Sequence, residues 1–358
     1  MLFDPIQIRG QEIRNRIWLP PMCQYQVEGG DGRAGDWHLV HYGARAAGGF
    51  GLIVVEATAV AAQGRITVGD LGLWEDGQID RLARLVDFSQ RRGSTMAVQL
   101  AHAGRKGSVW PDLPQFPRGS QPVDQGGHTT WGPTAEPFPG LAAPRSLSAE
   151  QVAALPDQFA QAARRADLAG FDVVELHAAH GYLLHQFLSP LSNGRQDQWG
   201  GDFEGRTRLL RQVVESVRRV WPERKPVFVR LSATEWTDDG WSLDDTIALV
   251  ERLTPLGVDL IDVSTGGNLI TRIPTAPGYQ VRFASQIKRA TGALTAAVGL
   301  ITEPAQAEQI VQSGQADAVL IGRAALREPA WPERAALDLG VDTPMAPPYH
   351  RGALRRPA

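Results

Sequence analysis

The sequence predicts an α/β protein built as a single (β/α)8 TIM barrel, and three observations support this prediction. Eight short runs rich in valine, isoleucine and leucine alternate with longer amphipathic stretches along the 358 residues. Most of these runs are apolar throughout, as expected for parallel strands buried on both faces. A unit of helix, glycine and strand recurs around Gly170, Gly257 and Gly314. Eight β-then-α units in one chain are typical of this barrel.

The eight apolar runs give the strand ranges directly. The predicted strands are Arg16–Pro20, Leu52–Glu56, Met96–Leu100, Asp172–Leu176, Val227–Leu231, Leu260–Val263, Leu294–Val298 and Ala318–Ile321. A doubly wound open sheet is the alternative, but that fold usually shows a glycine-rich fingerprint after its first strand. Since no such fingerprint follows Pro20, the barrel is favoured.

Helical periodicity fills the gaps between the strands. The predicted helices are Ile79–Arg91, Ser148–Ala169, Arg206–Val220, Leu243–Leu256, Gln280–Ala290 and Glu303–Gln312. The second of them opens with Ser148 and Gln151 in the spacing of a capping box and ends before Gly170.

Length alone gives a prior of two domains, at about 150 residues each. The strand count instead favours one domain over residues 1–358. The widest gap between strands contains residues 107–145, which are dense in proline, glycine and glutamine. This segment is too long for a plain connector and is predicted to be a lid-like excursion after the third strand.

Composition excludes several classes of protein. The net charge of −3 is too close to balance for a nucleic-acid binder with a basic face. No apolar run approaches the roughly 20 residues that cross a bilayer, and the first residues do not resemble a signal peptide. The single cysteine, Cys23, excludes an internal disulfide and an iron–sulfur cluster. We therefore expect a cytoplasmic protein that has no membrane or nucleic-acid partner.

Barrel enzymes gather their chemistry at the carboxyl ends of the strands. The last two strands end in Gly299 and in Gly322-Arg323. Glycines let backbone N–H groups approach an anion, and a guanidinium binds phosphate through two hydrogen bonds. These residues predict a phosphate site, against the alternative of tight turns followed by a surface arginine.

Two polar residues lie inside otherwise apolar strands. Arg230 in the fifth strand needs either an internal carboxylate or an electron-rich ligand, because an unpaired buried charge is costly. Gln99 holds the analogous position in the third strand and can donate to and accept from a planar heterocycle. A structural ion pair and a structural glutamine remain the alternatives.

His177 and His180 form an H-x-x-H pair after the fourth strand, and Tyr182 follows two residues later. Two imidazoles can donate hydrogen bonds to one substrate oxygen, and the phenol can supply a proton nearby. A metal-dependent barrel hydrolase is the alternative, although zinc would need a third ligand and the HExxH pattern is absent. Our prediction is that the site holds no metal.

Cys23 follows Pro20, Pro21 and Met22 at the end of the first strand. A lone cysteine is more often a small apolar residue than a nucleophile. No base lies next to it in the sequence, so covalent catalysis by Cys23 is not predicted.

These strand ends resemble the old yellow enzyme family of FMN-dependent ene-reductases, or NADPH dehydrogenases, in its thermophilic-like class. The resemblance covers nearly the whole chain and rests on several long motifs in the right order. They are Pro20-Pro-Met-Cys-Gln-Tyr, Val55-Glu-Ala-Thr-Ala-Val with Gly64-Arg-Ile-Thr, Gln99-Leu-Ala-His-Ala-Gly-Arg-Lys, Glu175-Leu-His-Ala-Ala-His-Gly-Tyr-Leu-Leu-His-Gln-Phe-Leu-Ser-Pro, Val229-Arg-Leu-Ser, Pro277-Gly-Tyr-Gln-Val, Ala297-Val-Gly-Leu-Ile-Thr and Ile321-Gly-Arg.

The resemblance implies a role for each candidate residue. The residues implied to bind FMN are Pro20, Pro21, Met22, Cys23, Ala57, Gln99, Arg230, Gly299, Gly322 and Arg323. Cys23 would tune the redox potential of the flavin. The residues implied to bind substrate are Tyr25, His177, His180, Tyr182 and Arg351, with Tyr182 as the proton donor.

The implied reaction is ping-pong. NADPH, or NADH, reduces FMN and leaves, and then flavin N5 gives hydride to the β-carbon of an activated alkene while Tyr182 protonates the α-carbon. The implied substrates are α,β-unsaturated aldehydes, ketones, imides and nitroalkenes. A phosphosugar isomerase or aldolase would explain the phosphate site but not Met22-Cys23. A dienoyl-CoA-reductase-like enzyme would need an iron–sulfur cluster.

The chain departs from the family's pattern at two places. Gly205 stands where an asparagine is usual in Asp202-Phe-Glu-Gly-Arg, which is expected to loosen a structural hydrogen bond. The tail, residues 345–358, resembles the segment whose arginine enters the site of a neighbouring subunit, but it lacks the usual aromatic ending. The resemblance therefore implies a homodimer, or a homotetramer of dimers, in which Arg351 completes the partner's site.

Overall fold

Eight parallel strands close into a barrel in this computed structural model, which describes residues 1–342 and 346–352. The barrel strands are β3 (Ile17–Leu19), β4 (Leu52–Ala59), β5 (Thr95–Ala101), β8 (Val173–Ala178), β9 (Val227–Ser232), β10 (Leu260–Ser264), β11 (Leu294–Ala297) and β12 (Ala318–Leu320). They follow one another in this order around the ring, and β12 pairs with β3 to close it. The predicted barrel and all eight predicted strands are confirmed. β4 runs three residues further than expected, through an irregularity between Val55 and Thr58.

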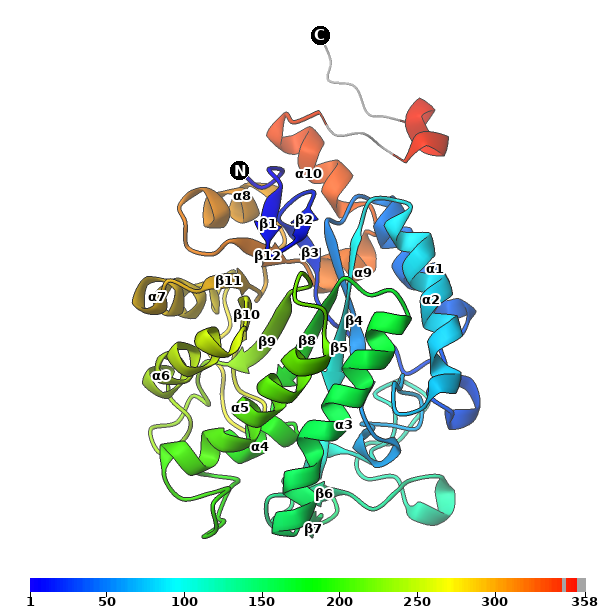
Figure 1. Ribbon diagram of the computed structural model, residues 1–358. Helices are drawn as coiled ribbons and strands as arrows, with labels where there is room; N and C mark the ends of the chain where they lie inside the picture. The colour runs from blue at the N-terminus through cyan, green and yellow to red at the C-terminus, as the bar shows by residue number, and fades with distance from the viewer. Residues whose placement is uncertain (343–345, 353–358) are drawn as a thin grey trace.

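Helices surround the barrel (Figure 1). The α-helices are α1 (Asp36–Ala47), α2 (Ile79–Gln90), α3 (Ala149–Leu168), α4 (Leu183–Leu188), α5 (Phe203–Val220), α6 (Leu243–Leu253), α7 (Val281–Thr291), α8 (Pro304–Gln312), α9 (Arg323–Arg327) and α10 (Trp331–Leu339). The short 3-10 turns are η1 (Glu28–Gly30), η2 (Ala62–Gly64), η3 (Asp76–Gln78), η4 (Gly104–Lys106), η5 (Val123–Gln125), η6 (Thr254–Leu256) and η7 (Pro347–Gly352). None of the helices within residues 1–342 and 346–352 is long and apolar enough to cross a membrane.

The six predicted helices are confirmed, whereas α1, α4, α9 and α10 were missed. The capping box of α3 forms as expected, because Gln151 N–H donates to Ser148 Oγ at 3.2 Å and Ser148 N–H donates to Gln151 Oε1 at 2.8 Å. α1 escaped detection because its buried face includes the polar residues His38, His41 and Arg45. A search for apolar periodicity does not register such a face.

An N-terminal hairpin that the sequence did not predict covers one end of the barrel (Figure 1). Its strands are β1 (Ile6–Ile8) and β2 (Gln11–Ile13). Their isoleucines join a buried cluster that includes Trp18 and Phe228, whose rings stack with centroids 5.9 Å apart. Side chains therefore fill this end of the barrel, and the carboxyl ends of the strands lie at the other.

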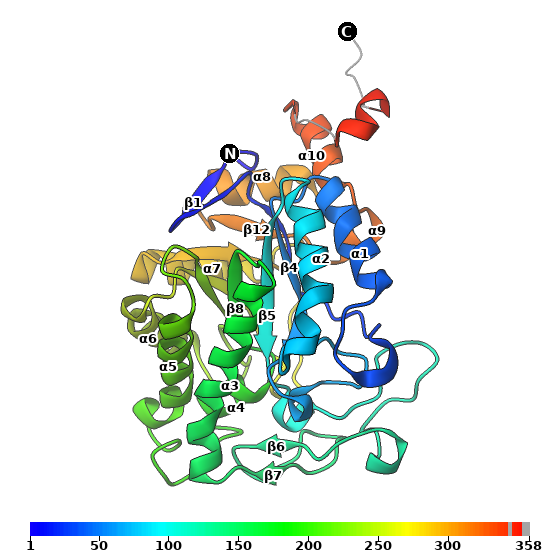
Figure 2. The same cartoon turned by 45° about the vertical axis from the view of Figure 1, so that its right-hand side comes forward.

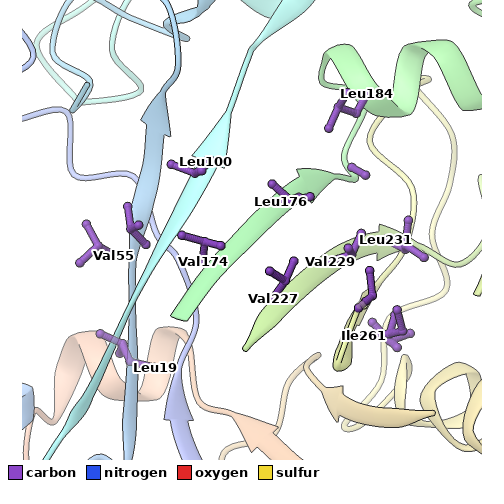
Figure 3. Packing of buried hydrophobic residues seen from close by; sticks show 14 of the residues in the cluster. Leu19, Val55, Leu100, Val174, Leu176, Leu184, Val227, Val229, Leu231 and Ile261 are labelled. Atoms are coloured by element: carbon purple, nitrogen blue, oxygen red, sulfur yellow. The ribbon is translucent and has the colours of Figure 1, made fainter. Parts of the chain in front are cut away.

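A second apolar layer lies between the strands and the helices. Figure 3 shows Leu100, Val174 and Leu176 on neighbouring strands, and these residues belong to the large cluster that also includes residues of α2, α3 and α5. Because side chains alternate along a strand, the residues between them point into the barrel. The site is built from those inward positions.

The excursion at residues 107–145 lies at the carboxyl ends of the strands, far from the hairpin (Figure 2). It contains η5 and β6 (Trp131–Gly132), which pairs with β7 (Arg145–Ser146). Val109, near its beginning, packs against the same small cluster as Cys23 and Tyr182. This contact brings the excursion next to the candidate site.

Gly205 is explained by close approach at the start of α5. A Cβ atom there would lie 2.0 Å from the carbonyl oxygen of Gly200. Asp202 still caps the helix, since its side chain accepts from Gly205 N–H at 2.8 Å. This capping bond is made by the backbone of residue 205 and does not depend on its side chain.

Candidate active site

Three neighbouring strands become polar on their inward faces toward their carboxyl ends. The first inward residue of each is apolar and belongs to the cluster under the hairpin. The next two carry charge or hydrogen-bonding groups. Read in order along β8, β9 and β10, the inward residues are Val173, Glu175 and His177; Phe228, Arg230 and Ser232; and Leu260, Asp262 and Ser264.

The residues of the predicted phosphate site come together around one cavity. A cavity of about 150 Å³ is lined by Arg230, Gly299, Gly322 and Arg323, among others. Gly299 has a φ of +120°, a conformation that favours glycine, and a Cβ there would lie 3.0 Å from Tyr279. Residue 299 therefore places no side chain in this cavity. The guanidinium groups of Arg230 and Arg323 and the backbone of the glycines border it.

Pro20 and Met22, at the end of the first strand, lie close to Gly322, which lines this cavity. Their side chains are the nearest atoms to a Cβ built on Gly322, at 3.6 Å and 3.7 Å. A substituent at Gly322 would therefore extend toward the segment that carries Pro21 and Cys23.

Of the two partners that the sequence allowed for Arg230, an internal carboxylate or an electron-rich ligand, the structure shows an internal carboxylate. Nε of Arg230 lies 3.0 Å from Oδ2 of Asp262 on the neighbouring strand, and both side chains are buried. Gln99 is also held by a carboxyl group, because its Nε2 donates to Oε1 of Glu175 at 2.8 Å. This bond leaves the carbonyl oxygen of the Gln99 amide available to accept a hydrogen bond from a ligand.

The two histidines face each other, with Nε2 of His177 3.4 Å from Nδ1 of His180. Ala179 N–H donates to Nδ1 of His177 at 3.3 Å, so a neutral His177 carries its proton on Nε2. Nε2 of His180 lies 2.7 Å from Oγ of Ser264. When Ser264 donates in this bond, His180 carries its proton on Nδ1. Two N–H donors then converge on one point, as binding of a single oxygen requires.

Both imidazoles are held neutral. Burial lowers the pKa of His177 and of His180 well below the usual value, and the positive charges of Arg230 and Lys106 lower both further. Lys106 Nζ donates to the carbonyl oxygens of His180 and Gly267 at 2.8 and 2.7 Å. Its own pKa is lowered to about 8, by burial and then by the charge of Arg105.

Tyr182 caps the start of α4 and lies against the histidines. Its ring centroid is 4.9 Å from that of His177, and Nζ of Lys106 is 5.2 Å from its ring centroid. Burial raises the pKa of the Tyr182 phenol, and nearby Cys23 and Asp70 raise it further. The phenol is therefore protonated at neutral pH and can act as a proton donor.

Cys23 and Tyr25 lie near Tyr182. Cys23 packs with Ala57 and Tyr182 in one small cluster. Burial raises the pKa of the Cys23 thiol well above its usual value, and neighbouring Asp70 and Glu56 add to the effect. A neutral thiol is a poor nucleophile, consistent with the absence of covalent catalysis. Tyr25 has a φ of +55°, and Cys23 and Tyr182 contribute to its raised pKa.

Arg351 is the one candidate residue that the structure does not bring to this pocket. It lies in η7, at the same end of the barrel as the N-terminal hairpin (Figure 1). Residues 345 and 353–358 of the predicted tail lie outside the described residues. In this structure η7, which contains Arg351, lies away from the carboxyl ends of the barrel strands.

The sequence argument assigned no role to Lys106, Asp262 or Ser264, which the structure places in the site. Asp262 and Ser264 could have been found, because they are polar residues two positions apart in an otherwise apolar strand. Lys106 carried no such signal. It follows β5 in a 3-10 turn, and only tertiary contacts bring it to His180.

The fold and the site define a barrel enzyme that binds a phosphate-bearing ligand beside a pair of neutral imidazole donors. No group of three or more His, Cys, Asp or Glu side chains in residues 1–342 and 346–352 is placed to hold a metal ion. Comparison with known proteins makes the class specific.

Residues 1–341 match the family described as the NADH:flavin oxidoreductase / NADH oxidase family. The chain is 44% identical over 353 residues to an NADPH dehydrogenase of Geobacillus sp. (strain WCH70), covering 98% of each chain. It is 44% identical over 352 residues to an NADPH dehydrogenase of Bacillus subtilis (strain 168), again covering 98% of both. The chain therefore belongs to the NADH:flavin oxidoreductase / NADH oxidase family, and the resemblance to the old yellow enzyme family is confirmed.

Solved structures agree with the fold. A morphinone reductase superposes with a TM-score of 0.78 at 27% identity, covering 95% of this chain and 90% of that one. A 2-naphthoyl-CoA reductase superposes with a TM-score of 0.86 at 25% identity over 95% of this chain and 52% of that one. The protein is an oxidoreductase of the old yellow enzyme type, with FMN and a nicotinamide nucleotide as its cofactors. The metal-dependent hydrolase is not favoured.

The described residues fit FMN. Arg230 is buried and paired with Asp262 through Nε, and the residue borders the cavity that Gly299, Gly322 and Arg323 also line. A phosphate suits the glycine and arginine end of this cavity, and a polar ring edge suits Arg230 and Gln99. The same arrangement gives the phosphosugar alternative no use for Gln99 or Cys23.

Proposed function

We propose that this chain uses NADPH, or NADH, to reduce the activated C=C bond of α,β-unsaturated aldehydes, ketones, imides or nitroalkenes. The observation that carries the proposal is the pair of imidazole nitrogens, His177 Nε2 and His180 Nδ1, 3.4 Å apart beside Tyr182. Neutral donors fixed on one oxygen stabilise the negative charge that develops there when a nucleophile adds to the conjugated carbon. A carbonyl or nitro oxygen fits this role.

The residues below would hold FMN, which would supply the hydride-transfer chemistry between the nicotinamide nucleotide and the β-carbon of the alkene. The proposed ring contacts are Pro20, Pro21, Met22, Cys23, Ala57, Gln99 and Arg230, and the proposed phosphate contacts are Gly299, Gly322 and Arg323. Arg230, Gly299, Gly322 and Arg323 line one cavity, which supports the assignment. Cys23, a neutral thiol, tunes the cofactor and forms no covalent bond.

Tyr182 completes the reduction by protonating the α-carbon. The β-carbon gains hydride and the α-carbon gains the phenolic proton, so the C=C π bond is replaced by two C–H bonds. The raised pKa of Tyr182 keeps that proton in place until negative charge reaches the substrate. Proton transfer from a positioned side chain typically contributes about 10²- to 10⁴-fold in rate.

Tyr25 is proposed to close over the substrate, with the excursion at residues 107–145 as a lid. Its neighbours support this role, because Asp112 of the excursion contributes to the raised pKa of Tyr25. Arg351 is proposed to enter the site of a neighbouring subunit in a homodimer or a homotetramer of dimers. The place of η7, which contains Arg351, at the other end of the barrel is compatible with such a role in trans. We also propose that the protein is cytoplasmic.

Two half-reactions test the function. We expect the purified protein to be yellow and to release FMN on denaturation. Under anaerobic conditions NADPH should bleach the flavin absorbance, and an α,β-unsaturated ketone should restore it, whereas the saturated ketone should not. Restoration by neither compound would contradict ene reduction, and activity that a chelator abolishes would favour the hydrolase.

A further inference from the structure

Four buried polar side chains form a continuous network inside the barrel, below the histidines. Gln99, Glu175, Arg230 and Asp262 come from the consecutive strands β5, β8, β9 and β10, and we call them the interior quartet. Their exposed fractions are 2%, 1%, 6% and 1%. In the order of their contacts the four residues are Gln99, Glu175, Asp262 and Arg230. The first and last, Gln99 and Arg230, are the residues proposed to hold the FMN ring. The two carboxyl groups between them have no role in the reaction described so far.

Strand register explains why the four side chains meet. Glu175 pairs with Gln99 across one strand boundary, and Asp262 pairs with Arg230 across another. The contacts follow this register, at 2.8 Å from Gln99 Nε2 to Glu175 Oε1 and 3.0 Å from Arg230 Nε to Asp262 Oδ2. Each carboxyl group therefore contacts one of the two ligand-facing side chains.

The surroundings of Asp262 bear on the protonation of this network. Both of its carboxyl oxygens are buried; Oδ2 forms the ion pair with Arg230 Nε at 3.0 Å, and neither oxygen accepts a well-aligned hydrogen bond from an N–H or O–H of the described residues. The remaining neighbour is the carboxyl group of Glu175, which is within hydrogen-bonding reach. Two carboxyl groups form a hydrogen bond only when one of them is protonated. Charge balance agrees, because two carboxylates against one guanidinium would leave a net negative charge in a dry barrel.

We propose that Glu175 and Asp262 share one proton and act as a singly charged counter-ion of Arg230, which sets the charge that the protein presents to the FMN ring. Glu175 donates the shared proton, and Asp262 is the carboxylate that faces Arg230. The proposal rests on the proposed placement of the FMN ring against Gln99 and Arg230. Neither carboxyl group touches the substrate, so both are positioning residues.

The direction of each pKa agrees with this assignment. Burial raises the pKa of Glu175 well above its usual value, and Asp262 raises it further, whereas Arg230 lowers it. Burial also raises the pKa of Asp262, but Arg230 and the hydrogen bond from Glu175 lower it. Glu175 therefore keeps its proton more firmly than Asp262.

The shared proton has two consequences for the cofactor. It fixes the Gln99 amide, since Glu175 Oε1 accepts from Gln99 Nε2 and the amide oxygen is left for the ligand. It also leaves one negative charge beside Arg230. That charge partly cancels the attraction between Arg230 and the negative charge that reduction adds to the ring. Neutralising the pair should therefore make the cofactor easier to reduce.

Infrared spectroscopy of the wild-type protein tests the proton directly. We expect a band from a protonated carboxylic acid at neutral pH, shifted when the protein is labelled with ¹³C-glutamate and absent in Glu175→Gln. Glu204→Gln is the matched control, because Glu204 is a half-exposed carboxylate paired with Arg211 and Arg252. The labelling needs no variant, so it remains decisive if Glu175→Gln fails to fold. A spectrum without a glutamic-acid band would overturn the proposal.

The midpoint potential of bound FMN tests the counter-ion. Each single variant, Glu175→Gln or Asp262→Asn, removes a carboxyl group but leaves the pair with one negative charge, so we expect little change. The double variant removes that charge. We expect it to raise the equilibrium constant for reduction tenfold or more, which is about 30 mV for a two-electron couple. Glu204→Gln should match the wild type.

Two outcomes of the potential measurement would overturn the proposal. Equal increases in both single variants would show that both carboxyl groups are ionised. A double variant with the wild-type potential would show that the pair does not face the cofactor. If the wild-type protein nevertheless shows the infrared band of the protonated glutamic acid, the ring placement, and not the shared proton, is at fault. The two measurements thus distinguish failure of the inference from failure of the proposed function.

Discussion

Nε2 of His180 lies 2.7 Å from Oγ of Ser264, a residue at the end of the strand that also carries Asp262. Thr265 Oγ1 donates to Gln280 Oε1 at 2.6 Å, whereas Ser264 Oγ is 3.4 Å from that oxygen. Ser264 Oγ is closer to His180 than to Gln280, and when it donates to His180 Nε2 the imidazole proton lies on Nδ1, on the side of His177.

Replacing Ser264 with alanine should remove the hydrogen bond that favours the Nδ1-protonated tautomer of His180. We expect Ser264→Ala to raise KM for the alkene about 2- to 10-fold, the effect of losing one hydrogen bond between neutral groups. The rate of flavin reduction by NADPH should change less. Steady-state and stopped-flow kinetics would measure both, with Ser313→Ala on the exposed end of α8 as the control. An equal loss in both half-reactions would contradict the tautomer role.

Replacing Tyr182 with phenylalanine should remove the proton donor but keep the ring that packs on His177. We expect the alkene half-reaction to slow by about 10²-fold or more, because general-acid catalysis is lost. Flavin reduction by NADPH should remain close to the wild-type rate. Single-turnover absorbance measurements would separate the two steps, and equal losses would exclude Tyr182 as the donor.

Lys106→Gln should move the pH dependence of the reaction. The positive charge of Lys106 is one of the causes that lower the pKa of His177 and His180, so its removal should raise both values. The acidic limb of kcat/KM for the alkene should therefore shift to higher pH. Above pH 8 the two enzymes should become more alike, because wild-type Lys106 loses its own charge there.

Lys288→Gln provides the comparison for this experiment. Lys288 pairs with Asp317 at 2.8 Å on the outside of the barrel. Its loss should leave the pH profile in place. A Lys106→Gln profile that coincides with the wild type at acidic pH would show that Lys106 does not act on the histidines.

Glu235 should make the fold sensitive to acid. It is fully buried and accepts from Ser189 Oγ, Trp241 N–H and Asn268 Nδ2, each at 2.7 Å. Burial raises the pKa of Glu235, but His185 and hydrogen bonds such as those from Trp241 and Ser189 lower it by more. The net result is a pKa lowered to about 2. A carboxyl pKa below its unfolded value stabilises the fold above that unfolded value. This contribution is lost as the pH falls from about 4.5 to about 2.

Denaturant unfolding at several pH values would measure the effect. At pH 6 we expect Glu235→Gln to lower the free energy of unfolding by about 3 kcal/mol, and the difference should shrink as the solution is acidified. Glu204→Gln, which removes a half-exposed carboxylate, should have a small effect at every pH. A difference for Glu235→Gln that does not vary with pH would contradict the lowered pKa.

Arg351 tests whether a neighbouring chain completes the site. If it enters the partner's pocket, Arg351→Ala should raise KM for the alkene while the FMN content stays unchanged. A mixture of Arg351→Ala and Tyr182→Phe chains should then recover some activity, because one site in a mixed dimer has both residues intact. Wild-type kinetics in Arg351→Ala, or a mixture no better than its parts, would refute sharing.

The order of strands and the predicted phosphate residues could be read from the sequence because each is a local pattern. Apolar runs gave the eight strands, and the glycines and Arg323 at the last strand ends lie around one cavity as expected. Helix α1 was hidden because its buried face is partly polar. The hairpin β1–β2 was hidden because its strands are only three residues long.

The sequence by itself therefore determined the barrel, the family and the chemical types present at the strand ends. Only the tertiary structure decided which of those groups meet. The partner of Arg230 is Asp262, 32 positions along the chain, and the partner of Gln99 is Glu175, because parallel register aligns residues that are distant in sequence. Proton positions follow from such contacts. Local sequence patterns cannot specify them, since burial and hydrogen bonding between strands fix each pKa and each tautomer.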